Sequence, residues 1–259
     1  MKNIILSRKD KELLEKVIID HGRIVTFEQI KTVFQDVYTP AETKNRVSFL
    51  SKLGWFLRIK RGLYVVITDI ATLDFNDISL HTIANILNSD SYISFENALQ
   101  YHSMFDQMLV SVESVTDKRA RRYKFKNSII RFYRIKKELY FGFKEVKSDI
   151  GLVKIAEKEK ALLDILHFRS DLYHASLVWE KIREYKDMID FNLLKEYAKK
   201  YGFDVIREIG FFLDRVEIDT ADLLAIVKGR NSYSKMGKEA KQFDSKWRLY
   251  FDSRIIQQI

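Results

Sequence analysis

The sequence contains no cysteine, which excludes disulfide bonds, thiolate metal ligands and cysteine nucleophiles. A single proline and nine glycines argue against long disordered linkers. No run of apolar residues reaches the length of roughly eighteen that a membrane-spanning helix needs. We therefore expect a soluble, cytoplasmic protein that has no membrane partner.

The sequence also lacks the common motifs of catalytic and cofactor sites. Its five histidines show no metal-ligand spacing such as H-E-x-x-H, and neither a glycine-rich nucleotide loop nor a G-x-S-x-G elbow is present. These absences predict a protein that is not an enzyme, with no catalytic residue, no metal ligand and no cofactor. We interpret the histidines as structural.

Positive charge is in excess, with 45 lysines and arginines against 36 aspartates and glutamates and a net charge of +9. This balance favours a polyanionic partner such as nucleic acid or an anionic membrane. The length of 259 residues favours two domains. Residues 68–90 contain no lysine or arginine, and we place the boundary near residue 72, which gives domains of residues 1–72 and 73–259.

Three helix starts are marked in the first domain. Ser7 precedes an apolar stripe that ends at Gly22, and Thr26 and Gln29 have the spacing of a capping box. Thr39 and Glu42 repeat that spacing. Pro40 then occupies the first helical position, where its missing N–H has no intrahelical partner to lose. The pattern predicts a helix from Pro40 to Gly54.

The third helix has two faces in the sequence. Val47, Phe49, Leu50 and Leu53 recur at helical spacing and predict a buried side, while Lys44, Asn45, Ser48 and Lys52 fall on the opposite side.

A hairpin is predicted after Gly54. Trp55, Leu57 and Ile59 alternate with Phe56, Arg58 and Lys60, and residues 63–67 return as an apolar strand after a tip at Lys60, Arg61 and Gly62.

Helix, short strand, helix, helix and hairpin is the order of a winged helix-turn-helix, which places its second helix of the pair in the major groove of DNA. Asparagine can pair with adenine there, and lysine or arginine with guanine or phosphate. An ordinary solvated helix face is the alternative reading. The predicted DNA-binding residues are Thr39, Thr43, Lys44, Asn45, Arg46, Ser48, Lys52, Arg58, Lys60, Arg61 and Gly62.

The second domain is expected to be α+β. Alternating patterns predict an antiparallel sheet within about residues 91–155, and 3.6-residue periodicity predicts helices within about 156–228. A last strand at about 245–252 is expected to rejoin the sheet.

Residues 118–137 hold ten lysines and arginines interleaved with aromatic residues. Three readings stay open: extra phosphate contact, an RNA-binding or interaction module that stacks bases, or a solvated sheet face. The candidate second basic patch is Lys118, Arg119, Arg121, Arg122 and Lys124.

One alternative function comes from Glu145-Val146-Lys147. This triplet resembles the E-x-K half of a metal-dependent nuclease site, which Asp117 would complete around magnesium. Under this reading the protein would cleave DNA.

Several segments resemble the AbiEi family of type IV toxin–antitoxin antitoxins. They are Arg61-Gly62-Leu63-Tyr64-Val65, residues 92–102 (YISFENALQYH), Phe132-Tyr133-Arg134-Ile135, Phe141-Gly142-Phe143, and Ala156 with residues 159–164 (EKALLD).

The resemblance implies a bifunctional antitoxin. Its winged helix would repress its own operon by binding inverted repeats, through the helix around Lys44, Asn45 and Ser48 and the wing from Arg58 to Gly62. The larger domain would counteract a nucleotidyltransferase toxin, AbiEii, without a stable complex. We therefore predict a DNA-binding transcriptional repressor that acts as an antitoxin, with its oligomeric state open.

Overall fold

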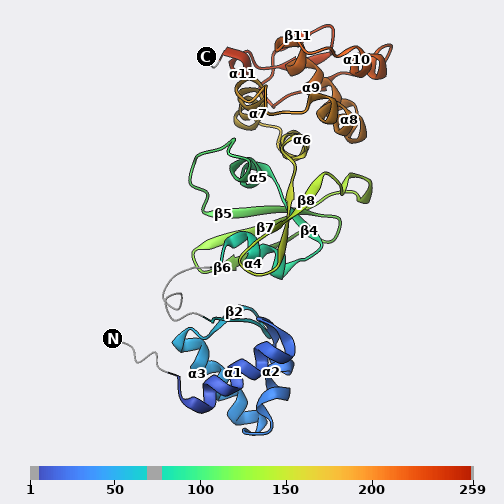
Figure 1. The fold of residues 1–259 in the computed structure, drawn as a ribbon. Coiled ribbons are helices and arrows are strands. Elements are labelled where there is room, and N and C mark those ends of the chain that lie inside the picture. Colours follow the sequence, from blue (N-terminus) through green and yellow to red (C-terminus); the bar gives the residue numbers. More distant parts are fainter. Residues whose placement is uncertain (1–5, 69–77, 258–259) are drawn as a thin grey trace. The chain divides into compact units, whose positions relative to one another are not determined.

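The structure is a computed structural model that describes residues 6–68 and 78–257 (Figure 1). Contacts divide the chain into two units. The first comprises the described residues up to Ser89 together with Lys147–Val153, and the second comprises Asp90–Val146 together with the described chain from Lys154. The boundary expected near residue 72 lies outside the described residues. The fold is α+β, as expected.

The amino-terminal part of the first unit has the predicted order of helix, strand, helix, helix and hairpin (Figure 1). The three strands form an antiparallel sheet in the order β1-β3-β2. The elements are α1 (Arg8–His21), β1 (Ile24–Thr26), α2 (Phe27–Phe34), α3 (Pro40–Leu53), β2 (Phe56–Lys60) and β3 (Leu63–Val66), and α4 (Leu80–Leu87) belongs to the same unit.

Local capping explains where these helices begin and end. The side chain of Ser7 accepts a hydrogen bond from the Asp10 N–H, and Thr26 and Thr39 each close a reciprocal capping box. Each box satisfies helix N–H groups that would otherwise lack partners. Gly54 ends α3 with φ of 95°, a left-handed conformation that glycine adopts without steric cost. The predicted helix starts are confirmed.

The hairpin departs from the predicted alternation. Phe56, expected on the polar side with Arg58 and Lys60, is 1% exposed, while Leu57 is only partly buried. The register against β3 shifts between Arg58 and Lys60, and such an irregularity changes which side chains share a face. Trp55 and Ile59 are buried and Arg58 and Lys60 are exposed, as the alternation predicts, so the prediction was wrong only at Phe56 and Leu57.

The second unit is built on a six-stranded sheet in the order β6-β7-β5-β4-β9-β8. The prediction of an antiparallel sheet was wrong in part, because β5 pairs with β7 and β4 pairs with β9 in parallel. These pairings join strands that are not chain neighbours, so local patterns do not determine them. The strands are β4 (Ser91–Ile93), β5 (Ser111–Thr116), β6 (Arg121–Phe125), β7 (Ser128–Arg134), β8 (Phe143–Lys147) and β9 (Leu152–Ala156).

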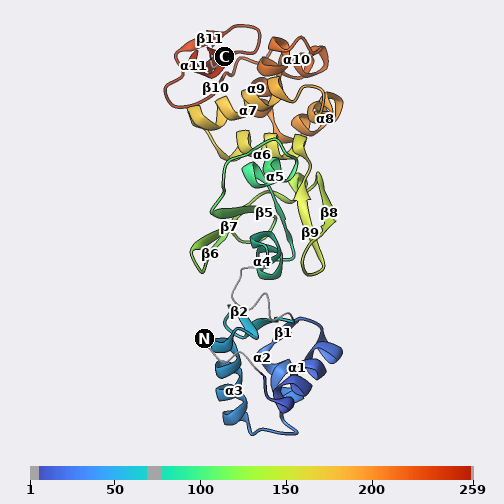
Figure 2. The ribbon, with the colours of Figure 1, turned by 60° about the vertical axis from the view of Figure 1, so that its left-hand side comes forward.

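Helices α5 (Phe95–Tyr101) and α6 (Lys158–Phe168) lie on the same face of this sheet (Figure 2). The ring of Tyr133 on β7 contacts both helices, at 5.1 Å from the Phe95 centroid and 5.5 Å from that of Phe168. These three rings fix the helices against the sheet, since aromatic pairs at such spacing add to the energy of burial.

A buried polar cluster lies within the hydrophobic core of the second unit. The Asp164 carboxylate on α6 is fully buried and accepts hydrogen bonds from Lys160 Nζ at 2.8 Å, Ser94 Oγ at 2.7 Å, Tyr92 at 3.1 Å and Tyr201 at 2.5 Å. Burying an ion pair is tolerated when its remaining lone pairs are satisfied in this way.

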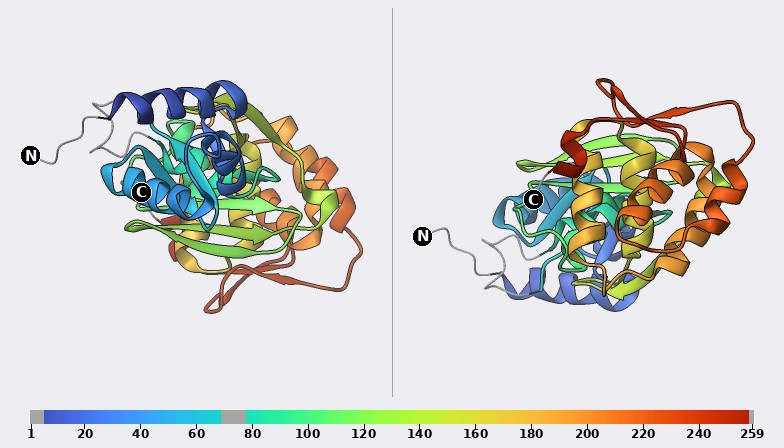
Figure 3. Two further views of the ribbon diagram at one scale, coloured as in Figure 1. Left: turned by 90° about the horizontal axis from the view of Figure 1, so that it is seen from below. Right: turned by 90° about the horizontal axis from the view of Figure 1, so that it is seen from above.

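The carboxy-terminal part is helical, as predicted, and ends in a small sheet of its own (Figure 3). The expected last strand does not rejoin the six-stranded sheet but forms the middle of a second sheet, β10-β12-β11. The remaining elements are η2 (Lys137–Leu139), α7 (Leu172–Glu184), α8 (Phe191–Tyr201), α9 (Phe203–Arg215), α10 (Ala221–Val227), β10 (Ser234–Lys235), β11 (Gln242–Asp244), β12 (Leu249–Phe251) and α11 (Arg254–Gln257).

The small sheet is held by Trp247. Its indole is fully buried and donates to Asp214 at 2.7 Å. A Cβ at Gly210 of α9 would lie 2.1 Å from the indole ring, so α9 needs a glycine where the tryptophan packs. This contact explains why the last strand stays with α9.

None of the helices in residues 6–68 and 78–257 combines the length and the apolar character needed to cross a membrane.

Candidate nucleic-acid interface

Helix α3 exposes a polar face. Its buried residues are Thr43, Val47 and Leu50. The side chains predicted to read DNA are exposed around the opposite side of the helix: Lys44, Asn45, Ser48 and Lys52. Within the described chain, neither lysine has a carboxylate within 4.0 Å. The face therefore offers ammonium, amide and hydroxyl groups to a ligand.

Two threonines of the predicted set have other roles. Thr43 is fully buried, so it cannot contact DNA, and it falls on the buried side because it lies four residues before Val47. Thr39 is exposed, but its hydroxyl is used in the cap, where it donates to Glu42 at 2.8 Å. We remove Thr43 from the interface and interpret Thr39 as the residue that fixes where α3 begins.

Arg46 is held inside the unit. Its Nε donates to Asp10 Oδ1 at 2.6 Å, and its Nη2 donates to Asp10 Oδ2. Asp10 is 1% exposed. Burial alone would raise the pKa of Asp10, but the hydrogen bonds from Arg46 and Ser7 outweigh it and hold the pKa below its ordinary value. Arg46 joins α3 to α1 and is not a free cation.

The hairpin tip is exposed and anchored. Arg58, Lys60 and Arg61 are exposed, and Gly62 has φ of 74°, a turn conformation that favours glycine. The Gly62 carbonyl accepts the Phe27 N–H at 2.9 Å. The tip is therefore short and held at the start of α2, so the tip cations are presented from a fixed backbone.

The predicted second basic patch lies on an edge strand, β6, and on the turn that precedes it. Lys118, Arg119, Arg121, Arg122 and Lys124 are all exposed, and β6 is the outermost strand of its sheet. Lys118 and Arg119 line a shallow hollow with Arg134 and Asp117. Charged residues on an edge strand also prevent sheet-to-sheet pairing, so the readings left open by the sequence stay open.

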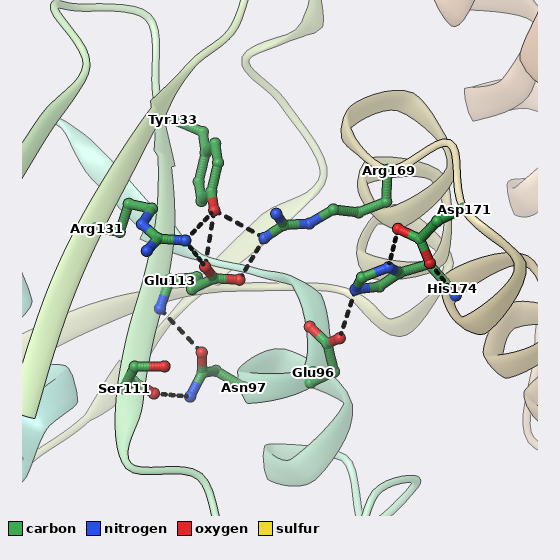
Figure 4. Close-up of polar contacts among 9 residues, drawn as sticks. All are labelled: Glu96, Asn97, Ser111, Glu113, Arg131, Tyr133, Arg169, Asp171 and His174. Atoms are coloured by element: carbon green, nitrogen blue, oxygen red, sulfur yellow. Dashed lines mark hydrogen bonds and ion pairs between the residues drawn. The ribbon is translucent and has the colours of Figure 1, made fainter. Parts of the chain in front are cut away.

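Arg131, which the sequence analysis counted with this strip, instead belongs to a partly buried cluster around Glu113 (Figure 4). It donates to Glu113 at 3.1 Å and to Tyr133 at 2.9 Å, and Arg169 donates to the same carboxylate at 2.6 Å. Burial lowers the pKa of Arg169, but Glu113 and Tyr133 outweigh it and raise the pKa. Sequence patterns did not predict this cluster, because Glu113 and Arg169 are 56 residues apart.

His174 joins α7 to α5 in the same view (Figure 4). Its Nε2 lies 3.2 Å from a Glu96 oxygen, and its Nδ1 lies 2.7 Å from an Asp171 oxygen. Burial lowers the pKa of His174, but the two carboxylates outweigh it and raise the pKa. His174 therefore links α7 to α5 through these two carboxylates.

The residues of the alternative nuclease site are not brought together. Glu145 and Lys147 lie on β8, while Asp117 follows β5, and two strands lie between β5 and β8 in the sheet. At the usual strand spacing β5 and β8 are about 14 Å apart, too far for side chains to share one metal ion. Among the described residues, no group of three or more acidic or histidine side chains is placed to hold a metal ion.

No protein-family model and no curated protein matches the chain. Among solved structures, the fold is similar to the crystal structure of the RV2827C protein from Mycobacterium tuberculosis, with a TM-score of 0.59 over 96% of this chain and 92% of that chain. The two sequences are 11% identical, so the similarity concerns the fold alone. It extends over both units, which indicates that their combination is not peculiar to this chain.

Proposed function

We propose that residues 6–68 form a winged helix-turn-helix that binds duplex DNA, and that the protein is a transcriptional repressor acting as an antitoxin. In this arrangement α3 enters the major groove and the β2–β3 hairpin lies on the flanking phosphates. The observation that carries the proposal is the exposed face of α3, where Lys44, Lys52 and Asn45 have no side-chain partner among residues 6–68 and 78–257.

The chemistry of this face supports sequence readout. The Asn45 side chain can give adenine two hydrogen bonds, and Lys44 can reach guanine or a phosphate oxygen. Both side chains are exposed on a helix whose start is fixed by a capping box. A fixed helix presents its side chains in one orientation, which direct readout requires.

The hairpin supports backbone contact. Lys60 and Arg61 stand on a turn whose carbonyl is bonded to the start of α2, so little entropy is lost when the turn binds. Each phosphate that such a cation neutralises steepens the salt dependence of binding by about 0.9 in log–log slope.

The antitoxin part of the proposal rests on the resemblance to AbiEi, which stays a prediction. Its test is coexpression of the chain with the product of an adjacent nucleotidyltransferase gene, followed by cell growth. We expect growth to be restored by the intact chain. Continued growth arrest would remove the antitoxin part and leave DNA binding untouched.

DNA binding is tested on the full chain. A preferred duplex is selected in vitro from a random-sequence library, and its affinity is measured by fluorescence anisotropy at fixed salt. We expect the variant with Lys44, Asn45, Arg58, Lys60 and Arg61 changed to alanine to bind at least roughly 100-fold more weakly, from one lost base contact and several lost phosphate contacts.

The matched control loses four exposed lysines of the carboxy-terminal part: Lys228, Lys235, Lys238 and Lys241. It has the same loss of charge as the test variant but no change on α3 or the hairpin, so we expect binding close to that of the intact chain. Equal losses in both variants would mean that affinity depends on net charge alone and would contradict the proposed interface.

A further inference from the structure

Phe49 lies where the sequence pattern does not expect it. The spacing of apolar residues places it on the buried side of α3, yet its side chain is 46% exposed. It follows Asn45 by four residues and precedes Lys52 by three, so it is next to both on the helix surface. An aromatic ring therefore stands on the same face as the groups proposed to read DNA.

The ring is held in place from inside the unit. The Arg46 guanidinium lies 4.6 Å from its centroid, and that guanidinium is fixed by two contacts to the buried Asp10 carboxylate. Ser7 also contacts the carboxylate. This chain of contacts limits the positions that the ring can take, unlike a phenylalanine that packs loosely on a surface.

Three side chains on the same face as the ring are short. Ala41, Asn45 and Ser48 are exposed along the same face, and none of them reaches as far from the helix axis as a phenyl ring. Phe49 therefore reaches farther from the helix axis than these three neighbours.

We propose that Phe49 contacts the 5-methyl group of a thymine in the major groove and so determines specificity at that base pair. The methyl group is the apolar feature of the groove, and a phenyl ring is among the side chains that read it. The inference rests on the proposed function. It adds that one base pair of the bound duplex must contain a thymine, in contact with Phe49. Arg46 is a positioning residue, because its guanidinium is bonded to Asp10 and supports the ring.

The test removes the methyl group and nothing else. In the selected duplex each thymine in turn is replaced by deoxyuridine, and affinity is measured for the intact chain and for Phe49→Ala. For the intact chain we expect one replacement to weaken binding about four-fold, the effect of burying one methyl-sized group. For Phe49→Ala the same replacement is expected to have no effect.

The controls use the same unit. Ile19 is 81% exposed on α1, so Ile19→Ala removes an exposed apolar side chain away from α3 and should keep the full response to deoxyuridine. Phe49→Leu keeps apolar surface and is expected to keep part of the response. Thermal unfolding shows whether each variant is folded. The effect of deoxyuridine on binding by the intact chain is measured independently of the variants.

The outcomes separate the two proposals. If no duplex is enriched from the library, the proposed function fails. If a duplex is enriched but all its thymines respond equally in the intact chain and in Phe49→Ala, the inference about Phe49 is overturned while DNA binding stands. A change of oligomeric state on Phe49→Ala without DNA would also overturn it, because the ring would then serve contact between copies.

Discussion

The cations of α3 and the hairpin differ in their surroundings from those around Glu113 and Asp164. On α3 and the hairpin, Lys44, Lys52 and Lys60 are exposed and directed to solvent. Around Glu113, two guanidinium groups bond a single carboxylate from opposite sides, and deeper still Lys160 is fully buried against Asp164. The first arrangement leaves charge available, and the second uses charge to hold strands and helices together.

The difference shows why net charge alone does not assign an interface. A guanidinium that is paired with a carboxylate of the protein is not free to pair with a polyanion, although it counts equally in a charge total. Arg46 shows this within a single helix, since it lies on α3 among exposed cations but is paired with Asp10. Pairing and exposure, not composition, distinguish the two uses.

Removing the buried Asp164 carboxylate of the second unit should give the largest loss of stability. Asp164→Asn leaves the buried Lys160 ammonium without its counter-charge, and the free energy of unfolding should fall by roughly 3–5 kcal/mol. Urea denaturation of the full chain measures it. Glu12→Gln, which breaks only an exposed pair with Arg8, is the control and should change stability by less than about 0.5 kcal/mol. Similar losses of unfolding free energy in the two variants would contradict the distinction between buried and exposed charges.

Arg46→Ala should come next. It leaves the buried Asp10 carboxylate unpaired, so we expect a loss of about 3 kcal/mol from the first unit. Because the pKa of Asp10 is lowered in the folded state, the loss should be complete at neutral pH and shrink as the pH falls through that lowered pKa. Lys44→Ala on the exposed face is the control and should leave unfolding almost unchanged. An unchanged unfolding midpoint for Arg46→Ala would show that the pair is not structural.

The hairpin tip should affect binding without affecting stability. With Lys60→Ala and Arg61→Ala combined, the slope of log affinity against log salt should become shallower by about 1.8, two phosphate contacts in all. Anisotropy titrations between low and moderate salt measure the slope. The double variant Lys235→Ala, Lys238→Ala is the control. If the slope changes equally in the two double variants, the hairpin tip does not make the phosphate contacts.

The smallest effect should come from His174. Its pKa is raised by Glu96 and Asp171 in the folded state, so its contribution to stability is present below the unfolded pKa of about 6.5 and is lost as the pH rises through the raised value. His174→Gln should therefore be less stable than the intact chain at pH 5.5 and nearly equal at pH 9. Thermal unfolding at both pH values measures this, and a difference that grows with pH would contradict it.

Short-range signals predicted the first unit well. Thr39, Pro40 and Glu42 mark the start of α3 within four residues, and the structure confirms the cap. Capping depends on atoms that are close in the chain, so the residues involved can be read directly from the sequence. The helices of the carboxy-terminal part were predicted for a similar reason, since their apolar residues repeat every turn.

Predictions that needed long-range packing failed. Periodicity placed Phe49 in the core and left Thr43 for the interface, whereas the structure exposes the first and buries the second. Which side of α3 faces inward depends on where α1 and α2 lie, and Arg46 meets Asp10 across 36 residues. Sequence spacing carries no information about such a partner.

By itself, the sequence determined the helix ends, the element order of the first unit and the exposed cations of α3 and the hairpin, because each depends on neighbours a few residues away. Only the tertiary structure decided the parallel pairing of β5 with β7, the separate sheet of β12 and the sharing of Glu113 by two arginines. These features join segments far apart in the chain, and their energies depend on burial and geometry that exist only once the chain has folded.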